Sequence, residues 1–419
     1  MNNFVKRRVV VTGVGIVSCL GHAYEEVIRR LRGGESGVRG VPEWGQFGIK
    51  SLIAGTLEEV DAKRKSAPIA KELLLGMSDA ALYCSLSALD AVEDAGLTEK
   101  ELQSLRVGCI VGSGTGSVAT VYNAAKLAYS GQTRRIDPFT ILRCMSSSAS
   151  AAVANLLKVH GPSYSISAAC ATSAHNIGHA FSLVRSGVLD IVVAGGGEEV
   201  NELIAACFQG QRMTLSTGYN DTPEAASRPF DASRDGFVLS GGGGIVVLEE
   251  LGYAQARGAK VRAEVVGYGA TSDGYHMVAP SPDGVQAAAC MRMAIEDAGI
   301  RPEAIDYVNA HGTSTVAGDH AEIQAMREVF GDRIPSFSST KSMTGHAIGA
   351  AGVHELIYCI GMLEQGFLAP SINVNKIDPA FEGLALITES VNRGPTTVMT
   401  NNFGFGGTNA SLVLRRASR

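Results

Sequence analysis

Short apolar runs rich in Val and Ile alternate along the chain with longer segments whose apolar residues recur at helical spacing. The runs are four to six residues long and end at glycine or polar residues, which is typical of buried strands. The predicted strands span residues 8–12, 106–111, 190–194, 245–249, 305–308 and 397–400. Residues 24–32 and 78–95 are predicted helices, and residues 40–76 an irregular surface insertion. The alternation predicts an α/β fold.

The second half of the chain repeats the first. Residues 7–18 echo 261–272, 91–97 echo 294–300, 165–178 align without a gap on 336–349, and 241–250 parallel 406–416. Four echoes in the same order predict two α/β halves related by a pseudo-twofold axis, which we place at residues 1–255 and 256–419. In this alignment Lys341 lies opposite Cys170, and His346 lies opposite His175. The two helix N-termini would then meet at a pocket between the halves.

Composition and charge narrow the possible functions. The net charge is −5, from 36 Lys and Arg against 41 Asp and Glu, which gives no general attraction to nucleic acid or to an anionic membrane. The eight cysteines are scattered, without a C-x-x-C pair, which argues against disulfides and structural zinc. No apolar run reaches membrane-spanning length, and Gly13 and Gly15 interrupt the N-terminal run that resembles a signal peptide. We expect a cytoplasmic protein without nucleic-acid or membrane partners.

The stretch at 164–180, Y-S-I-S-A-A-C-A-T-S-A-H-N-I-G-H-A, carries the strongest chemical signal. A β-type alternation gives way to small residues and then to a helical pattern, so Cys170 is predicted where a buried strand leads into a helix N-terminus. Partial positive charge and free N–H groups at such an N-terminus favour a thiolate. The small neighbours leave room for a substrate, and we interpret Cys170 as a nucleophile. The alternative is a buried structural cysteine.

Three further stretches follow predicted strands. His311 stands in N-A-H-G-T-S-T, Lys341 and His346 stand in K-S-M-T-G-H, and a glycine-rich turn with two phenylalanines, N-N-F-G-F-G-G-T-N, begins at residue 401. Taken singly, each His is more typical of a structural role and Lys341 of a solvated one. Open α/β folds, however, gather ligands beyond the carboxyl ends of their strands, so we expect these residues to meet.

A cysteine nucleophile with two histidines suits acyl transfer through a thioester. Two neutral imidazoles can also donate Nε2–H to a developing enolate, which favours carbon–carbon bond formation over hydrolysis.

On these motifs the chain resembles the β-ketoacyl-[acyl-carrier-protein] synthases of the thiolase superfamily. The resemblance covers residues 8–416 and rests on A-C-A-T-S-A-H around Cys170, H-G-T-S-T at 311–315, K-x-x-T-G-H at 341–346 and N-x-F-G-F-G-G-T-N at 401–409. The first motif and G-G-G-E-E are more similar to type I bacterial elongation synthases than to type II. The family implies a thiolase-like duplicated fold with a layered α-β-α-β-α core.

The implied reaction is a decarboxylative Claisen condensation of a cysteine-bound acyl chain with malonyl-carrier protein, which yields 3-oxoacyl-carrier protein, CO2 and free carrier in fatty-acid elongation. Cys170 would accept the acyl chain, and His311 and His346 would stabilise the enolate. The backbone N–H groups of Cys170 and Phe405 would form the oxyanion hole, and Phe405 would also gate the pocket.

The remaining implied roles concern electrostatics and binding. Lys341 would set the electrostatics of the site, paired with Glu322 and near Asp319. The implied substrate-binding residues are Thr313 and Thr315 on the pantetheine arm, Thr115 and Met145 near an acyl tunnel completed across a dimer interface, and Phe237 and Phe403. We expect no metal in the catalytic site and no cofactor of the protein's own, because phosphopantetheine arrives on the carrier. Some relatives hold a structural monovalent cation near positions matching Asn309, Glu355 and 401–402, and the sequence leaves such a cation open.

The implied partners are acyl carrier protein, loaded with acyl or malonyl groups, and a second copy of the chain in a homodimer. Relatives carry basic carrier-docking residues before the M-S-D motif, where this chain has Glu72 and Leu75. Arg134 and Arg135 are the remaining candidates for docking, supported by the basic run at 63–65.

Four alternatives remain. A ketosynthase of a specialised polyketide or aryl polyene pathway fits the same motifs. A CoA-dependent thiolase needs a second cysteine in the turn at 403–409, which has none, and a non-catalytic partner subunit would lack the nucleophile. A nucleotide-binding oxidoreductase would rest on the glycines at 13–15 and 112–117, which lack a Walker lysine and the dinucleotide spacing and so favour tight turns.

Overall fold

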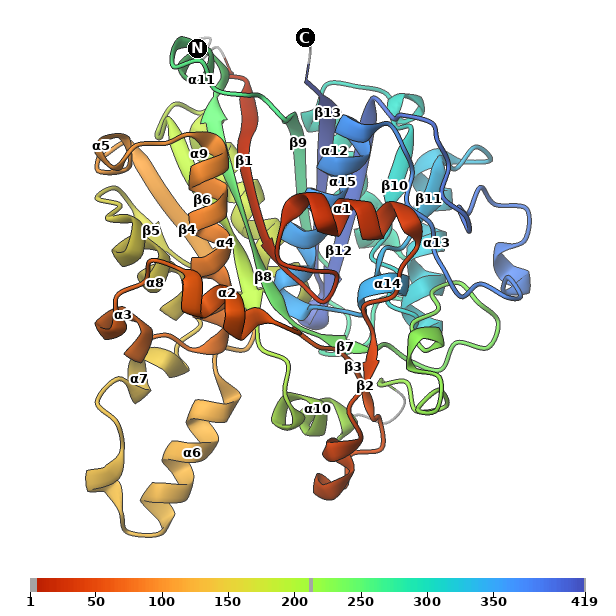
Figure 1. The fold of residues 1–419 in the computed structure, drawn as a ribbon. Coiled ribbons are helices and arrows are strands. Elements are labelled where there is room, and N and C mark those ends of the chain that lie inside the picture. Colours follow the sequence, from red (N-terminus) through yellow and green to blue (C-terminus); the bar gives the residue numbers. More distant parts are fainter. Residues whose placement is uncertain (1–5, 211–213, 418–419) are drawn as a thin grey trace.

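One mixed sheet of ten strands runs through the computed structural model, which describes residues 6–210 and 214–417 (Figure 1). The strand order is β11-β10-β12-β13-β9-β1-β8-β6-β4-β5. The first half of the chain contributes β1 (Val9–Val17), β4 (Val107–Gly112), β5 (Ser163–Tyr164), β6 (Ile191–Glu198) and β8 (Gly242–Glu250). The second contributes β9 (Ala263–Ser272), β10 (Tyr307–Asn309), β11 (Ser336–Ser338), β12 (Thr397–Gly404) and β13 (Thr408–Arg416).

Each half supplies five neighbouring strands, and the two sets mirror one another about the centre. β1 pairs with β9 there, and the antiparallel strands β8 and β13 occupy equivalent places on either side. The predicted duplication about a pseudo-twofold axis is confirmed. Because one sheet runs through both halves, the boundary at residue 255 stays a prediction.

Helices form layers on both faces of this sheet. The helices α9 (Thr172–Arg185) and α15 (Ala351–Gln365) contact each other and strands of both halves, so they form the central layer. On the outside, α4 (Asp79–Ala95) and α8 (Ser148–Leu157) cover the first half, while α12 (Val285–Asp297) and α13 (Val316–Phe330) cover the second. This is the α-β-α-β-α core that the resemblance implied, in which each β layer is one five-stranded half of the sheet and the halves join where β1 pairs with β9.

The burial of the elements follows from this layering. All nine residues of β1 are buried, and α15 is buried from Ala351 to Leu363, because helices or strands cover every side of them. β6 and β8 extend through the glycine runs that flank the predicted strands.

The glycine pair at 13 and 15 has a packing role. A Cβ at Gly15 would overlap the carbonyl oxygen of Ser87 on α4, so the helix lies directly on the strand backbone. Gly267 and Gly269 on β9 meet α12 in the same way. The tight turn predicted at residues 13–15 is therefore wrong, because Gly13 and Gly15 lie inside β1 and allow α4 to pack on it.

The ungapped alignment of 165–178 on 336–349 is wrong. A 3-10 turn, η3 (Ala169–Ala171), leads into α9, and its counterpart, η6 (Ile348–Ala350), leads into α15. Ala169 and Ile348 share the same unusual backbone angle, φ 45°. Cys170 is therefore equivalent to Gly349 rather than to Lys341. The residues that precede η6 form the extra helix α14 (Lys341–Thr344), and letter similarity alone does not reveal such an insertion.

The segment 40–76 is also more ordered than predicted. It contains η1 (Pro42–Phe47), β3 (Ile53–Gly55), α2 (Val60–Ser66) and α3 (Lys71–Leu75). Trp44 is buried, and β3 pairs with β7 (Leu239–Ser240) in a small second sheet that includes β2 (Arg39–Gly40). The segment therefore belongs to the wall of the apolar cluster that contains Cys170, which a search for periodicity in short elements does not detect.

The remaining elements lie at the surface or beside the site. They are α1 (Tyr24–Gly33), α5 (Glu99–Leu102), α6 (Val118–Tyr129), η2 (Thr133–Arg135), α7 (Thr140–Cys144), α10 (Glu202–Gln209), η4 (Pro223–Ala225), α11 (Leu251–Ala256), η5 (Pro302–Ala304), η7 (Pro379–Phe381) and η8 (Phe405–Gly407). The arm built from α6 projects from the body (Figure 1). Within the described ranges, no helix has the length and apolar character needed to cross a membrane.

Candidate active site

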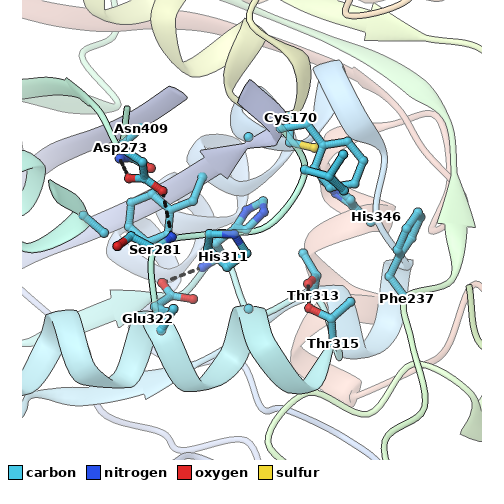
Figure 2. Close-up of a pocket in the computed structure, with 18 of the residues that line it drawn as sticks. Cys170, Phe237, Asp273, Ser281, His311, Thr313, Thr315, Glu322, His346 and Asn409 are labelled. Carbon is cyan, nitrogen blue, oxygen red and sulfur yellow. Dashed lines mark hydrogen bonds between the residues drawn. The ribbon is translucent and has the colours of Figure 1, made fainter. Parts of the chain in front are cut away.

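Turns from both halves bring Cys170, His311 and His346 together. Cys170 lies in η3 before α9, His311 follows β10, and His346 lies between α14 and η6. The cysteine sulfur and one ring nitrogen of each histidine lie within 4.8 Å of one another, and all three residues are buried (Figure 2). The sequence therefore predicted the meeting of these three side chains correctly.

The cavity around these residues includes most of the predicted substrate-binding positions. Its walls contain Phe237, Phe403, Phe405, Thr313, Thr315 and Glu322. The hydroxyl oxygens of Thr313 and Thr315 lie 3.0 Å apart (Figure 2). Thr115 and Met145 do not line this cavity. The Thr115 hydroxyl donates to Glu198 at 2.6 Å, and Met145 lies exposed just after α7. Their assignment to an acyl tunnel stays a prediction.

The turn that carries Cys170 is strained and buried. Ala169 adopts φ 45°, a left-handed conformation that costs free energy for a residue with a Cβ. Burial raises the pKa of the Cys170 thiol to about 11, although the backbone N–H of Phe405 and the charge of Lys341 both act to lower it. The expectation that the helix N-terminus favours a thiolate is therefore wrong for the free protein, since desolvation outweighs it.

The two histidines form a perpendicular pair of neutral rings. Their centroids lie 5.2 Å apart, and Phe237 packs against the His346 ring at 5.6 Å. Burial, reinforced by the charge of Lys341, holds the pKa of both imidazoles well below the usual range. Among the residues that the structure describes, neither ring nitrogen of His346 has a hydrogen-bond partner, so this ring is free to bind a ligand.

Lys341 pairs with Glu355, and the predicted pairing with Glu322 is wrong. The Lys341 ammonium forms a buried ion pair with Glu355 on α15 and lies 3.4 Å from His311 Nδ1. Asn402 Nδ2 donates to the other oxygen of Glu355 at 2.7 Å. Lys341 begins the inserted helix α14, and this position places its side chain against Glu355 on α15 rather than against Glu322 on α13.

Glu322 instead holds the backbone of the histidine loop. It accepts from the His311 N–H at 2.9 Å and the Gly312 N–H at 2.8 Å, and from Asn401 Nδ2 at 3.2 Å. Burial raises its pKa to about 7 despite these donors. Asp319, which the sequence placed near Lys341, pairs with Arg234 at 3.1 Å.

Sequence reasoning missed the role of Glu355 beside Lys341, although an acidic residue inside an apolar helix was a usable signal. It also missed Asp273, Ser281 and Asn409, which line the cavity mouth. Asn409 Nδ2 donates to Asp273 at 2.7 Å, and the Ser281 N–H donates to the same carboxylate at 3.1 Å (Figure 2). Asn409 lies in the motif at 401–409 and Ser281 in the stretch H-M-V-A-P-S-P-D-G at 276–284, but neither was given a role.

The donor set around Cys170 includes one sulfur and two imidazoles, the atom types that zinc prefers. The expectation that the site works without a metal remains a prediction.

The fold and the site together define a class of enzyme. A buried cysteine, two neutral imidazoles and a backbone N–H at the sulfur, at the centre of a duplicated thiolase-like fold, describe a condensing acyltransferase.

Comparisons with known proteins agree. The family description "Beta-ketoacyl synthase, N-terminal domain" matches residues 6–254, and "Beta-ketoacyl synthase, C-terminal domain" matches residues 262–375. The chain is 49% identical over 412 residues to the 3-oxoacyl-[acyl-carrier-protein] synthase 1 of Escherichia coli K12, covering 98% of this chain and 99% of that protein.

Two solved structures extend the likeness. A β-ketoacyl synthase from Burkholderia phymatum superimposes with a TM-score of 0.92 at 36% identity, over 98% of this chain and 100% of that one. A type II polyketide ketosynthase in complex with its acyl-carrier protein gives 0.88 at 31% identity, again over 98% and 100%. The chain belongs to the β-ketoacyl synthase family.

The raised pKa of Cys170 predicts an unusual pH profile for alkylation. Because iodoacetamide reacts with the thiolate, its rate at Cys170 should increase about tenfold per pH unit across the neutral range and well above the usual cysteine pKa of about 8.5. Peptide mass spectrometry after timed labelling measures this rate. A plateau near neutral pH would show that the sulfur is already a thiolate and would contradict this assignment.

Proposed function

We propose that this protein is a cytoplasmic 3-oxoacyl-[acyl-carrier-protein] synthase that extends acyl chains by two carbons in fatty-acid elongation. The observation that carries the proposal is the placement of the Cys170 sulfur and two neutral imidazoles in one buried cavity. The 49% identity to a synthase 1 over the whole chain favours elongation over a specialised polyketide or aryl polyene pathway.

In the first half-reaction, Cys170 takes the acyl chain from the carrier. Its sulfur attacks the thioester carbonyl, loses its proton as the new C–S bond forms, and phosphopantetheine leaves as the free thiol. Negative charge develops on the carbonyl oxygen during this step. The N–H groups of Cys170 and Phe405 stabilise it, and the effect of the Phe405 N–H on the pKa of the Cys170 thiol supports its closeness to the sulfur.

In the second half-reaction, malonyl-carrier protein loses CO2 and forms an enolate. His311 and His346, both held neutral by their lowered pKa, donate Nε2–H to the enolate oxygen. The enolate carbon then attacks the acyl thioester, the C–S bond to Cys170 breaks with its electron pair on sulfur, and the 3-oxoacyl product leaves on the carrier. The Cys170 thiolate takes one proton from solvent, which restores the thiol. The Lys341–Glu355 pair keeps a positive charge beside His311 and so disfavours its protonation.

The carrier delivers its pantetheine arm through the open side of the cavity, where Thr313 and Thr315 present two hydroxyls. The structural neighbour solved with its acyl-carrier protein supports a carrier as the partner. A homodimer is supported by the α6–α7 arm, which exposes large apolar side chains. These are Val121, Tyr122, Tyr129, Ile141 and Met145.

Arg134 and Arg135 are the proposed docking residues for an acidic carrier. Both lie on the exposed turn η2 of the arm, within reach of solvent. Lys63 is unsuitable for this role because it is tied to Asp90 and to the backbone of His22.

The two histidines should act on the malonyl half-reaction more than on acyl uptake. His311→Ala and His346→Ala are expected to load Cys170 with acyl chains but to decarboxylate malonyl-carrier protein about 10²–10³-fold more slowly, because each loses one donor to the enolate. Intact-protein mass spectrometry follows loading, and CO2 release follows decarboxylation. Cys170→Ser is the control that should not form the thioester. Wild-type decarboxylation in both histidine variants would refute their role.

Charge reversal on the arm tests carrier docking. Arg134→Glu combined with Arg135→Glu should raise KM for acyl-carrier protein, whereas Arg301→Glu, at a side chain 90% exposed elsewhere on the protein, should not. Added salt should reduce the difference in KM between the Arg134→Glu/Arg135→Glu variant and the wild type, because salt screens charge interactions beyond about 8–10 Å. Transfer from a small acyl-pantetheine should be unaffected. Equal losses with carrier and small substrate would mean that the arginines support the fold instead.

A further inference from the structure

His175 connects the helix that carries the nucleophile to the turn that carries Phe405. It lies on α9, five residues after Cys170, and both of its ring nitrogens have partners. Nδ1 lies 2.6 Å from the Tyr268 hydroxyl, and Nε2 lies 2.8 Å from Thr408 Oγ1. Tyr268 belongs to β9 and Thr408 begins β13, so the three side chains join the central helix of one half to two strands of the other.

The network is complete in either tautomer of the histidine. Burial lowers the pKa of His175 to about 4, so the ring is neutral at physiological pH, with one nitrogen that donates and one that accepts. The two hydroxyls can each take the complementary role. A neutral imidazole between two hydroxyls therefore has both nitrogens satisfied without a charge, which suits its half-buried position.

Tyr268 reaches His175 because α9 carries no side chain at Gly178. A Cβ there would overlap the Tyr268 ring, so the ring lies directly on the helix backbone. The Tyr268 ring stands perpendicular to the His175 ring, with centroids 6.1 Å apart. Close packing of the ring on α9 thus fixes the position of the Tyr268 hydroxyl, and its hydrogen bond with His175 Nδ1 fixes the orientation of the imidazole.

Thr408 contacts the base of the turn η8, which contains Phe405. It pairs with Gly404 across β12 and β13, and the two residues bracket η8, which carries Phe405. A Cβ at Gly404 would lie 2.8 Å from the Thr408 methyl group and 3.1 Å from the Cys170 nitrogen. The base of the turn is therefore held between Thr408 and the backbone of the nucleophile. Phe405 opens this turn directly after Gly404, and its backbone N–H acts on the Cys170 sulfur by lowering the pKa of the thiol.

We propose that His175, Tyr268 and Thr408 are positioning residues that hold the Phe405 N–H against Cys170 and so support acyl transfer to the sulfur. The inference rests on the proposed role of the Phe405 N–H as an oxyanion donor. None of the three side chains lines the described cavity that contains Cys170, so they act through the turn rather than on the substrate.

Two isosteric variants test the network. Thr408→Val and Tyr268→Phe each remove one hydroxyl and leave the shape almost unchanged. The matched control is Tyr164→Phe, which removes the hydroxyl of a second tyrosine–histidine pair on the same helix, where Tyr164 lies 2.9 Å from His179 Nε2. Four quantities are compared: the single-turnover rate of acyl uptake at Cys170, the rate of malonyl decarboxylation, the pH profile of Cys170 alkylation and the thermal midpoint.

Acyl uptake should fall about tenfold in both variants, less than the 10²–10³-fold expected for losing an oxyanion donor outright. Decarboxylation should change by less than about twofold, because its donors are the two histidines. The alkylation profile should move to higher pH, since the N–H that lowers the pKa of Cys170 is less well placed. Tyr164→Phe should match the wild type in every measurement.

Two results would overturn the proposal. One is wild-type acyl uptake with an unshifted alkylation profile in both variants. The other is an equal loss in both half-reactions together with a lower thermal midpoint, which would mean general structural support. If the wild-type protein itself failed to load Cys170, the proposed function would fall. The alkylation profile needs no carrier and would still decide whether the network positions the turn.

Discussion

The buried ion pair between Lys341 and Glu355 is the interaction on which the site depends. Both side chains are 2% exposed, and an unpaired charge at that depth would be strongly destabilising. Paired, they place a positive charge 3.4 Å from His311 Nδ1, in the buried interior. That charge and the burial act in the same direction on both imidazoles, so the site holds two neutral N–H donors at physiological pH.

The duplicated fold explains how these groups come to share one cavity. Each half contributes one central helix, and each helix follows a turn of the same shape. One residue in each turn adopts the same left-handed conformation: Ala169 before α9 and Ile348 before α15. The first turn holds the nucleophile. The second half contains an inserted helix, α14, which begins with Lys341 and is followed by His346. The two halves thus share the turn before the central helix but differ in the chemical groups placed there.

The sequence predicted the main strands and helices, the duplication and the meeting of Cys170 with His311 and His346. Long buried runs and motifs at strand ends can be recognised without knowing the tertiary contacts. Prediction failed where the outcome depends on a balance of effects. The Cys170 thiol is a case in point, since burial opposes the helix N-terminus and wins. The partner of Lys341 was missed because the local sequence does not show which helix packs opposite a side chain, and the structure places Glu355 of α15 there. The segment 40–76 was misjudged because its elements are too short to display a period.

The central claim is that His311 and His346 are neutral donors held so by burial and by Lys341, and nuclear magnetic resonance of the histidine side chains tests it most directly. Signals of protein labelled at the histidine ring would be assigned with His311→Gln and His346→Gln, and followed from about pH 8 to about pH 6 around the ordinary histidine pKa of about 6.5. The account predicts that both signals keep the chemical shifts of neutral imidazole over this range. Titration of either signal at or above the ordinary pKa would contradict it.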